Sequence, residues 1–269
     1  MIREKAIDTV LLDFEGTIFI QNDLIPGAAE TIQWLFDHNY KVRFVTNTTV
    51  LNRRQMRDRL KRVISADIPI EHFFTPARVA LHWFQMREMT HGIFPLVHSN
   101  LLEDLKGLPL TDKAPANFVL VGDMGNEWDI KQMNRALHCL LSGATLTTLL
   151  KNRFWNSYLD GVKLDAGAFV AALEYGADTS CRKVFGKPEE VFFSMALHDA
   201  ESKPETSVMV GDDLEFDVKG AEYAGIEGVL VKTGKFRPEI LLREDTSDIE
   251  IIESIADLPK LLMSKQEGF

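Results

Sequence analysis

Two strand-length apolar runs, far apart in this chain, each end on an aspartate. Residues 7–12 run directly into Asp13, and residues 208–210 lead through Gly211 into Asp212. Short β-branched and leucine-rich runs are typical of buried parallel strands. In an open α/β sheet, ligands bind beyond the carboxyl ends of the strands. The pattern therefore predicts that both aspartates lie at one edge of a parallel sheet, in a ligand site.

Strand and helix patterns alternate around these runs. Ile32, Leu35 and Phe36 recur at helical spacing, and Asn39 follows with the left-handed tendency common at helix ends. This order predicts an α/β fold with a doubly wound parallel sheet. We expect strands over residues 7–12, 41–45, 94–97, 118–121, 145–150, 208–210 and 226–232, and helices over 28–37, 51–63, 126–142, 166–175, 188–198 and 213–224.

The middle of the chain repeats this alternation with strands and helices of its own. It is about 100 residues long, which is enough for a separate hydrophobic core. We therefore predict a core domain formed by residues 1–75 and 181–269, with an α/β domain inserted as residues 76–180. Six basic residues within positions 53–62 are expected on the solvated face of the helix there.

The composition narrows the function classes. The chain of 269 residues is 45% hydrophobic and carries a formal net charge of −10, which argues against a general nucleic-acid binder. Apolar runs are shorter than a membrane span or a signal-peptide core, so we expect a cytoplasmic protein without a membrane partner. Cys139 and Cys181 have no second cysteine at metal-ligand spacing and are expected as buried or half-buried thiols.

The acidic residues suggest phosphoryl transfer. A carboxylate at the position of Asp13 can attack phosphorus, and a hard cation is needed where several acids meet a phosphate. Mg²⁺ is the expected cofactor, with Asp13 and Asp212 as side-chain ligands. Asp213 and Asp217 are expected to contact the metal through water or to orient its ligands.

Other polar residues supply the remaining groups. Thr46 and Asn47 follow a predicted strand and open a predicted helix, where they can bind phosphate oxygens. Lys187, in Gly186-Lys187-Pro188, can stabilise the transferring phosphoryl group. Read singly, these residues are a turn aspartate, a helix cap and a loop lysine, so their order and spacing carry the prediction.

Four segments, taken as a set, resemble the motifs of the haloacid dehalogenase-like (HAD) hydrolase superfamily. They are Leu11 to Thr17, Phe44 to Asn47, Val184 to Pro188 and Val210 to Asp217. The long insertion is similar to that of the C2-capped, NagD-like subfamily. Within this subfamily, the chain most resembles the groups of phospholysine phosphohistidine inorganic pyrophosphate phosphatase and HAD-like hydrolase domain-containing protein 2. The resemblance implies a Rossmann-like core with a C2-type cap. It implies an Mg²⁺-dependent phosphatase acting through an aspartyl-phosphate on a small phosphorylated substrate, and a homodimer through the cap.

By this resemblance Asp13 is the nucleophile, Thr46 and Asn47 hold phosphate, Lys187 steadies it and Asp212 binds the metal. The residue at position 15 gives its backbone carbonyl to the metal, and in most family members its side chain is the Asp that acts as general acid and base. Here it is Glu15. Because Glu is longer than Asp by about 1.5 Å, we expect weak action on alkyl phosphoesters and a preference for activated phosphoryl donors. A metal-independent dehalogenase and a regulatory protein without turnover remain the alternatives.

Overall fold

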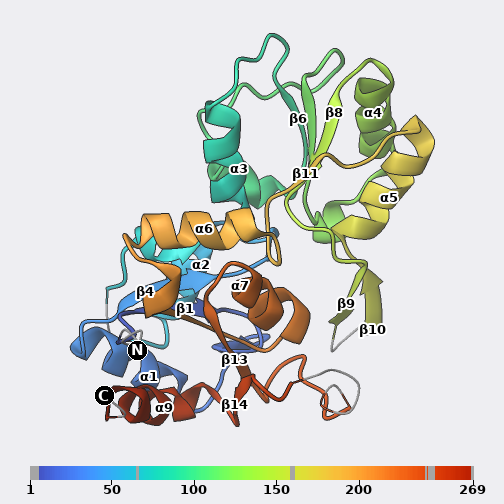
Figure 1. Cartoon of the computed structure of the whole chain (residues 1–269). Coiled ribbons are helices and arrows are strands. Elements are labelled where there is room, and N and C mark those ends of the chain that lie inside the picture. Colours follow the sequence, from blue (N-terminus) through green and yellow to red (C-terminus); the bar gives the residue numbers. More distant parts are fainter. Residues whose placement is uncertain (1–5, 65–66, 158–160, 240, 242–245, 268–269) are drawn as a thin grey trace. The chain divides into compact units, whose positions relative to one another are not determined.

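The computed structural model describes residues 6–64, 67–157, 161–239, 241 and 246–267. The chain forms two compact units (Figure 1). The first, or core unit, is made of residues 1–46, 54–74 and 187–269, and the second, or inserted unit, of residues 47–53 and 75–186. None of the helices in the described ranges is long and apolar enough to cross a membrane.

These bounds differ from the predicted domain limits at residue 75, which belongs to the inserted unit, and at two longer segments. Residues 47–53 belong to the inserted unit, because the Asn52 side chain donates to the Asn100 carbonyl at 3.1 Å and the Arg53 amide donates to Asp104 at 3.0 Å. Residues 181–186 also belong to it, because they contain a strand that pairs within the inserted sheet.

The core unit is built on a parallel sheet in the order β14-β13-β12-β1-β4-β5. The central strands are almost wholly buried, which explains their continuous apolar sequences. The strands are β1 (Thr9–Asp13), β4 (Lys41–Val45), β5 (Phe73–Phe74), β12 (Ser207–Gly211), β13 (Glu227–Val231) and β14 (Glu250–Ile252). A small antiparallel hairpin, β2 (Phe19–Ile20) with β3 (Asp23–Leu24), follows the end of β1.

Helices cover both faces of this sheet (Figure 1). Helix α1 (Ala28–Asp37) packs with α9 (Leu258–Glu267) on one face, and α6 (Glu190–Asp199) packs with α7 (Gly220–Tyr223) on the other. Helix α2 (Arg53–Lys61) follows β4, and a six-residue π-helical turn, η5 (Leu214–Lys219), joins β12 to α7. The short 3₁₀ turns are η1 (Ile70–His72), η4 (Pro204–Thr206) and η6 (Ile255–Asp257).

The inserted unit has its own parallel sheet, in the order β11-β8-β7-β6. Helix α3 lies on one side of it, and α4 and α5 pack together on the other (Figure 1). The elements are α3 (Pro76–Gln85), β6 (Ile93–Leu96), η2 (Ser99–Glu103), β7 (Phe118–Val121), η3 (Gly125–Glu127), α4 (Ile130–Leu141), β8 (Thr145–Thr148), α5 (Ala166–Ala177) and β11 (Lys183–Val184).

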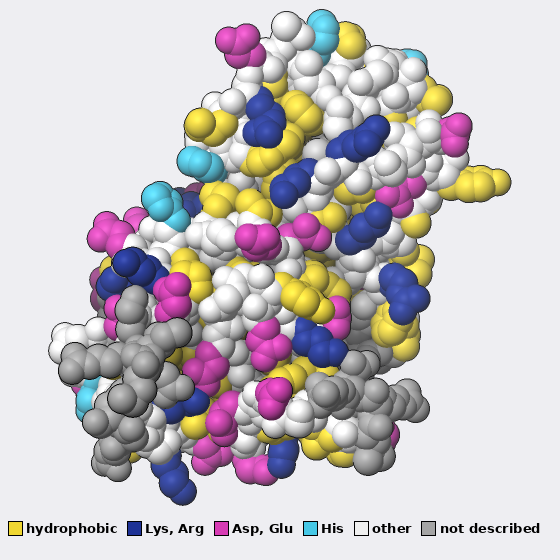
Figure 2. Space-filling model, viewed as in Figure 1, with side chains coloured by type: hydrophobic (Ala, Val, Ile, Leu, Met, Phe, Trp, Pro, Cys, Tyr) yellow, Lys and Arg dark blue, Asp and Glu magenta, His cyan; other side chains and the backbone are white. Residues whose placement is uncertain are grey.

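An antiparallel hairpin of the inserted unit exposes apolar side chains. It pairs β9 (Phe154–Ser157) with β10 (Gly161–Leu164), and Phe154, Val162 and Leu164 are 51%, 69% and 63% exposed. Figure 2 shows hydrophobic and basic side chains beside one another over this hairpin. Contiguous exposed apolar groups of this kind often mark a contact surface.

Most predicted elements are present, with shifted ends. The helix predicted over 188–198 begins at Glu190, because Glu189 keeps an extended backbone. The helix predicted over 126–142 begins at Ile130, because the Asp129 side chain caps it by accepting from the Lys131 amide. The helix predicted over 213–224 is replaced by η5 and the short α7. Cys139 is buried and Cys181 half-buried, which confirms their prediction.

Candidate active site

The two aspartates that end the apolar runs lie at the same edge of the core sheet. β1 and β12 are parallel neighbours, with Leu12 opposite Val210, so Asp13 and Asp212 follow adjacent strands at their carboxyl ends. Both side chains are nearly inaccessible, at 5% and 2% exposed. The parallel sheet therefore brings together carboxylates that are 199 positions apart in the sequence, as their spacing predicts.

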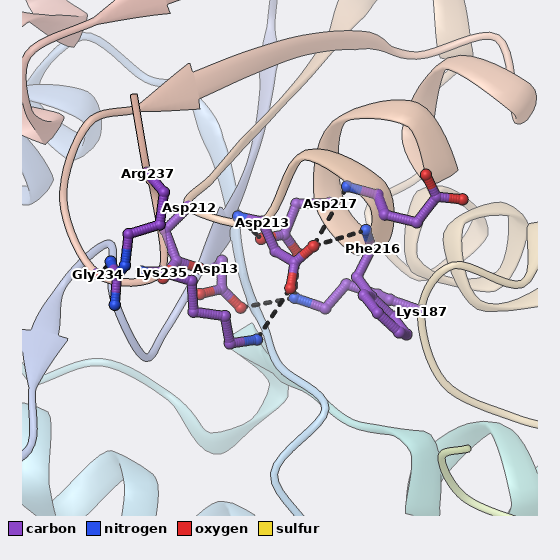
Figure 3. A network of polar contacts seen from close by, with 10 residues as sticks. Asp13, Lys187, Asp212, Asp213, Phe216, Asp217, Gly234, Lys235 and Arg237 are labelled. Atoms are coloured by element: carbon purple, nitrogen blue, oxygen red, sulfur yellow. Dashed lines mark hydrogen bonds and ion pairs between the residues drawn. The ribbon is translucent and has the colours of Figure 1, made fainter. Parts of the chain in front are cut away.

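Lys187 joins two of the buried acids. Its ammonium group donates to Asp13 and to Asp217, with both N–O distances at 2.6 Å (Figure 3). The lysine precedes α6, and its side chain is only 3% exposed. A buried ammonium group needs such partners, because an unpaired charge in this environment is costly.

Three carboxylates meet closely enough to share a cation. One oxygen each from Asp13, Asp212 and Asp217 lies within 4.8 Å of the others, and no comparable cluster of acids, histidines or cysteines occurs elsewhere in the described residues. Carboxylate oxygens are the ligands that Mg²⁺ prefers. The donor set therefore fits this ion, which these residues would hold.

The Asp217 carboxylate lies beside those of Asp13 and Asp212. Its Oδ2 accepts from the Asp213 amide at 3.1 Å, which turns the carboxylate back toward β12. A side chain at Gly211 would overlap Asp217, so the glycine leaves the room that this return requires. Asp217 thus lies close to the other two acids, and its expected role of contacting the metal through water or orienting its ligands stays a prediction.

The electrostatics of this group favour protonation or a bound cation. Burial raises the pKa of Asp13, with Lys187 opposing the shift, and raises that of Asp212 further because Asp13 and Asp217 add their negative charge. Burial also raises the pKa of Asp217 to about 7, again against Lys187. Although burial opposes the charge of Lys187, Asp13 and Asp217 raise its pKa and keep it an ammonium. An ion placed among the acids would relieve their repulsion.

Asp213 and Lys235 form a second contact beside the acids (Figure 3). The Asp213 carboxylate accepts from the Glu215 and Phe216 amides and so caps η5. It also receives the Lys235 ammonium at 3.0 Å, while the Lys235 amide donates to Asp212 at 2.6 Å. Lys235 is not among the residues that the sequence pattern predicts for the site. The sequence signal that could have identified Lys235 is the segment 232–236, which follows β13 (Glu227–Val231) and contains Gly234.

Two glycines allow the backbone to approach Asp212. Gly16 and Gly234 have positive φ values of 94° and 59°, and a Cβ on either would overlap the Asp212 carboxylate. The Thr233 hydroxyl also donates to the Gly16 carbonyl at 2.5 Å, which ties the two loops together. Glycine is the residue that adopts this conformation without steric cost.

Thr46 and Asn47 fall in different units. Asp13 is opposite Val45 across the β1–β4 pair, so Thr46 lies at the same carboxyl edge of the core sheet and is buried. Asn47 belongs to the inserted unit, where its amide oxygen lies close to Gly186. Thr46 therefore lies in the unit that holds the acids, and phosphate binding by either residue remains a prediction.

Glu15 is near the acids in sequence, but its carboxylate is bound elsewhere. It accepts a hydrogen bond from Arg59 of α2 and is 40% exposed. Burial raises the pKa of Glu15, and the Arg59 guanidinium opposes the shift. The Arg59 side chain is only 12% exposed, so the predicted solvated face of α2 does not include it.

Two family models match the two parts of the chain that contain the site residues. The one described as haloacid dehalogenase-like hydrolase matches residues 10–111, and the one described as HAD-hydrolase-like matches residues 184–258. Haloacid dehalogenase-like hydrolase domain-containing protein 2 from Bos taurus is 38% identical over 237 residues, covering 88% of this chain and 88% of its own. The chain belongs to the haloacid dehalogenase-like hydrolase family.

Two further proteins extend the comparison. Phospholysine phosphohistidine inorganic pyrophosphate phosphatase from Danio rerio is 35% identical over 240 residues, covering 87% of this chain and 86% of its own. The structure of NagD from Escherichia coli K-12 matches with a TM-score of 0.83 at 23% identity, covering 94% of this chain and 98% of its own. The two relatives confirm the predicted relationship to their groups of HAD hydrolases, and the NagD structure confirms the predicted α/β fold.

Proposed function

We propose that this HAD hydrolase is an Mg²⁺-dependent phosphatase that acts through an aspartyl-phosphate at Asp13 on a small phosphorylated metabolite. The observation that carries the proposal is the buried group of Asp13, Asp212 and Asp217 with Lys187 in contact. The phosphatase name of the Danio rerio relative supports it. A dehalogenase that attacks carbon without a metal would gain nothing from three carboxylates in one place.

Each residue has a part in the reaction. An oxygen of Asp13 forms a bond to phosphorus while the bond from phosphorus to the leaving group breaks, and the electron pair departs with that group. Lys187 binds an oxygen of the transferring phosphoryl group, and the cation would be held by Asp13 and Asp212, with Asp217 beside them. Bound Mg²⁺ supplies positive charge to the phosphate oxygens. Water then attacks phosphorus, its protons leave with the released phosphate, and the Asp13 carboxylate is restored.

We propose that activated phosphoryl donors are preferred. Glu15 replaces the usual acid, and its carboxylate binds Arg59, so the leaving group has no assigned proton donor. Acyl phosphates, phosphoramidates and pyrophosphate need that proton least. The Danio rerio relative is named for donors of these last two classes.

The first test is phosphate release from a panel of small phosphorylated compounds with and without Mg²⁺. We expect release that requires Mg²⁺, is lost in Asp13→Asn and persists in Asp37→Asn, a control at an acid on the last turn of α1. Release of halide from haloacids without added metal, in place of phosphate release, would support the dehalogenase alternative. The absence of release from every compound would support a regulatory protein.

The second test is Glu15→Asp, which restores the usual acid. We expect its activity on alkyl phosphates to rise relative to the wild type, because a general acid commonly contributes about 10²–10⁴-fold. Equal activity of the two proteins on alkyl phosphates would contradict the proposed preference.

We also propose a homodimer through the inserted unit. The exposed apolar side chains of the β9–β10 hairpin support this surface as the contact. Light scattering after size exclusion should give a dimer mass that Val162→Glu converts to the mass of a monomer. A monomeric wild-type protein would contradict this proposal.

A further inference from the structure

The contact between Glu15 and Arg59 links the end of β1 to helix α2. The Arg59 Nη1 atom donates to Glu15 Oε1, and both residues belong to the core unit. The guanidinium lies over two aromatic rings, with its carbon 4.1 Å from the centre of Phe19 and 5.5 Å from that of Phe14. Arginine stacked on aromatic faces in this way is held in place by packing as well as by charge.

Arg59 depends on Glu15. Its Nε and Nη2 atoms are buried and have no hydrogen-bond partner among the residues that the structure describes. The Glu15 carboxylate therefore supplies the negative charge for a guanidinium that is largely withdrawn from water. If Glu15 turned away, Arg59 would keep a desolvated charge without compensation, which is strongly unfavourable.

Glu15 is correspondingly absent from the cluster of acids. Asp13, two residues earlier, shares its site with Asp212 and Asp217, while the Glu15 carboxylate is not within that 4.8 Å group. The extra CH₂ of Glu extends its reach by about 1.5 Å relative to Asp. The longer side chain at position 15 and the buried arginine at position 59 thus form a matched pair.

We propose that Arg59 is a positioning residue that determines substrate class: it holds the Glu15 carboxylate on the α2 side, so that Glu15 does not protonate the leaving group. The inference rests on the proposed phosphatase function and deepens it. The contact between Arg59 and Glu15 then determines which phosphoryl donors react. The enzyme turns over donors whose leaving group departs without a proton. Removing Arg59 frees Glu15 to serve as the acid.

The test compares kcat/KM for acetyl phosphate with that for ethyl phosphate in Arg59→Met, which keeps an unbranched side chain against Phe14 and Phe19. We expect the ethyl-to-acetyl ratio to rise by about tenfold or more, part of the contribution of a general acid. The rise should disappear in the double variant with Glu15→Gln, because the freed carboxylate is then gone. Arg57→Met is the matched control, since Arg57 is on the same helix and pairs with Asp58.

A series of aryl phosphates gives an independent reading. Rates of Arg59→Met should depend less on the leaving-group pKa than those of the wild type, which a merely structural role of Arg59 would not produce. If Arg59→Met does not fold, as judged by thermal unfolding, Arg59→Gln takes its place, because it also removes the guanidinium charge that holds Glu15 and leaves Glu15 itself unchanged. An unchanged ratio in the folded variant overturns the inference. Failure of the wild type to release phosphate from any donor instead overturns the proposed function.

Discussion

At the scale of single residues, the ionised acids of the site lower the free energy of unfolding of the metal-free protein. Burial raises the pKa values of Asp13, Asp212 and Asp217, and the last reaches about 7 against an ordinary 3.8. The folded protein therefore binds these protons more tightly than the unfolded chain does. The contribution of Asp217 to stability is present at low pH and is lost as the pH rises from its ordinary pKa of 3.8 through about 7, and the raised pKa values of Asp13 and Asp212 act in the same direction.

We predict that Asp212→Asn stabilises the metal-free protein at pH 8 by about 1 kcal/mol, within the usual range for relief of functional strain. Asn keeps an oxygen for the Lys235 amide, which now donates to Asp212, but removes one negative charge. Urea unfolding with a chelator present measures the change, and the variant should lose less stability between pH 5 and 8. Lower stability than the wild type at pH 8 would contradict this account.

Lys187→Met is the control variant, and we expect it to lower the free energy of unfolding. It removes the ammonium group shared by Asp13 and Asp217 and leaves both carboxylates buried without it. Breaking a buried ion pair from one side commonly costs about 3–5 kcal/mol. The same unfolding experiment should therefore separate a stabilising from a destabilising change within one site.

The sequence pattern predicts the site residues that end strands, but it misses those whose place depends on contacts with distant parts of the chain. Asp13 and Asp212 end apolar strands, so a linear pattern reveals them. The direction of the Glu15 side chain depends on a partner 44 positions away, and Arg59 itself has the sequence context of a surface helix. Lys235 reaches the acids through a loop without any periodic pattern.

At the scale of elements, Asp213, which directly precedes η5, determines how η5 begins. Asp213 accepts from the Glu215 and Phe216 amides at 3.2 and 3.1 Å, and its own amide holds Asp217. We predict that Asp213→Ala lowers the free energy of unfolding by about 1 kcal/mol, the usual cost of a lost cap, and weakens Mg²⁺-dependent activity. Asp213→Asn should restore stability, because its side-chain oxygen still accepts these bonds. Equal destabilisation by both substitutions would exclude the capping role.

Elements with a local pattern agree with prediction most closely. The strand over 118–121, the strand over 41–45 and the helix over 28–37 have the predicted limits. The two-residue strands β5 and β11 could not be predicted, because they exist only through pairing with β4 and β8. Similarly, η5 is a π-helical turn whose start depends on a cap rather than on apolar spacing.

At the scale of the whole molecule, the chain crosses between two units at residues that look continuous in sequence. Residues 46 and 47 lie in one polar stretch, yet they belong to different units. The β/α alternation predicts two sheets, but the crossing points depend on side-chain contacts such as that of Asn52 with Asn100, which no local pattern reveals.

This division predicts a localised response to metal. Asp13, Asp212 and Asp217 all belong to the core unit, so Mg²⁺ at 100 times its dissociation constant should stabilise that unit by about 2.7 kcal/mol. Hydrogen exchange should show slower exchange in β1, β12 and η5 on adding Mg²⁺, with β7 and β8 of the inserted unit unchanged. Asp212→Asn, which lacks a ligand, should lose this response. Equal slowing in both units, or an undiminished response in Asp212→Asn, would mean that the ion acts through general ionic effects, and the buried acids would not be its site.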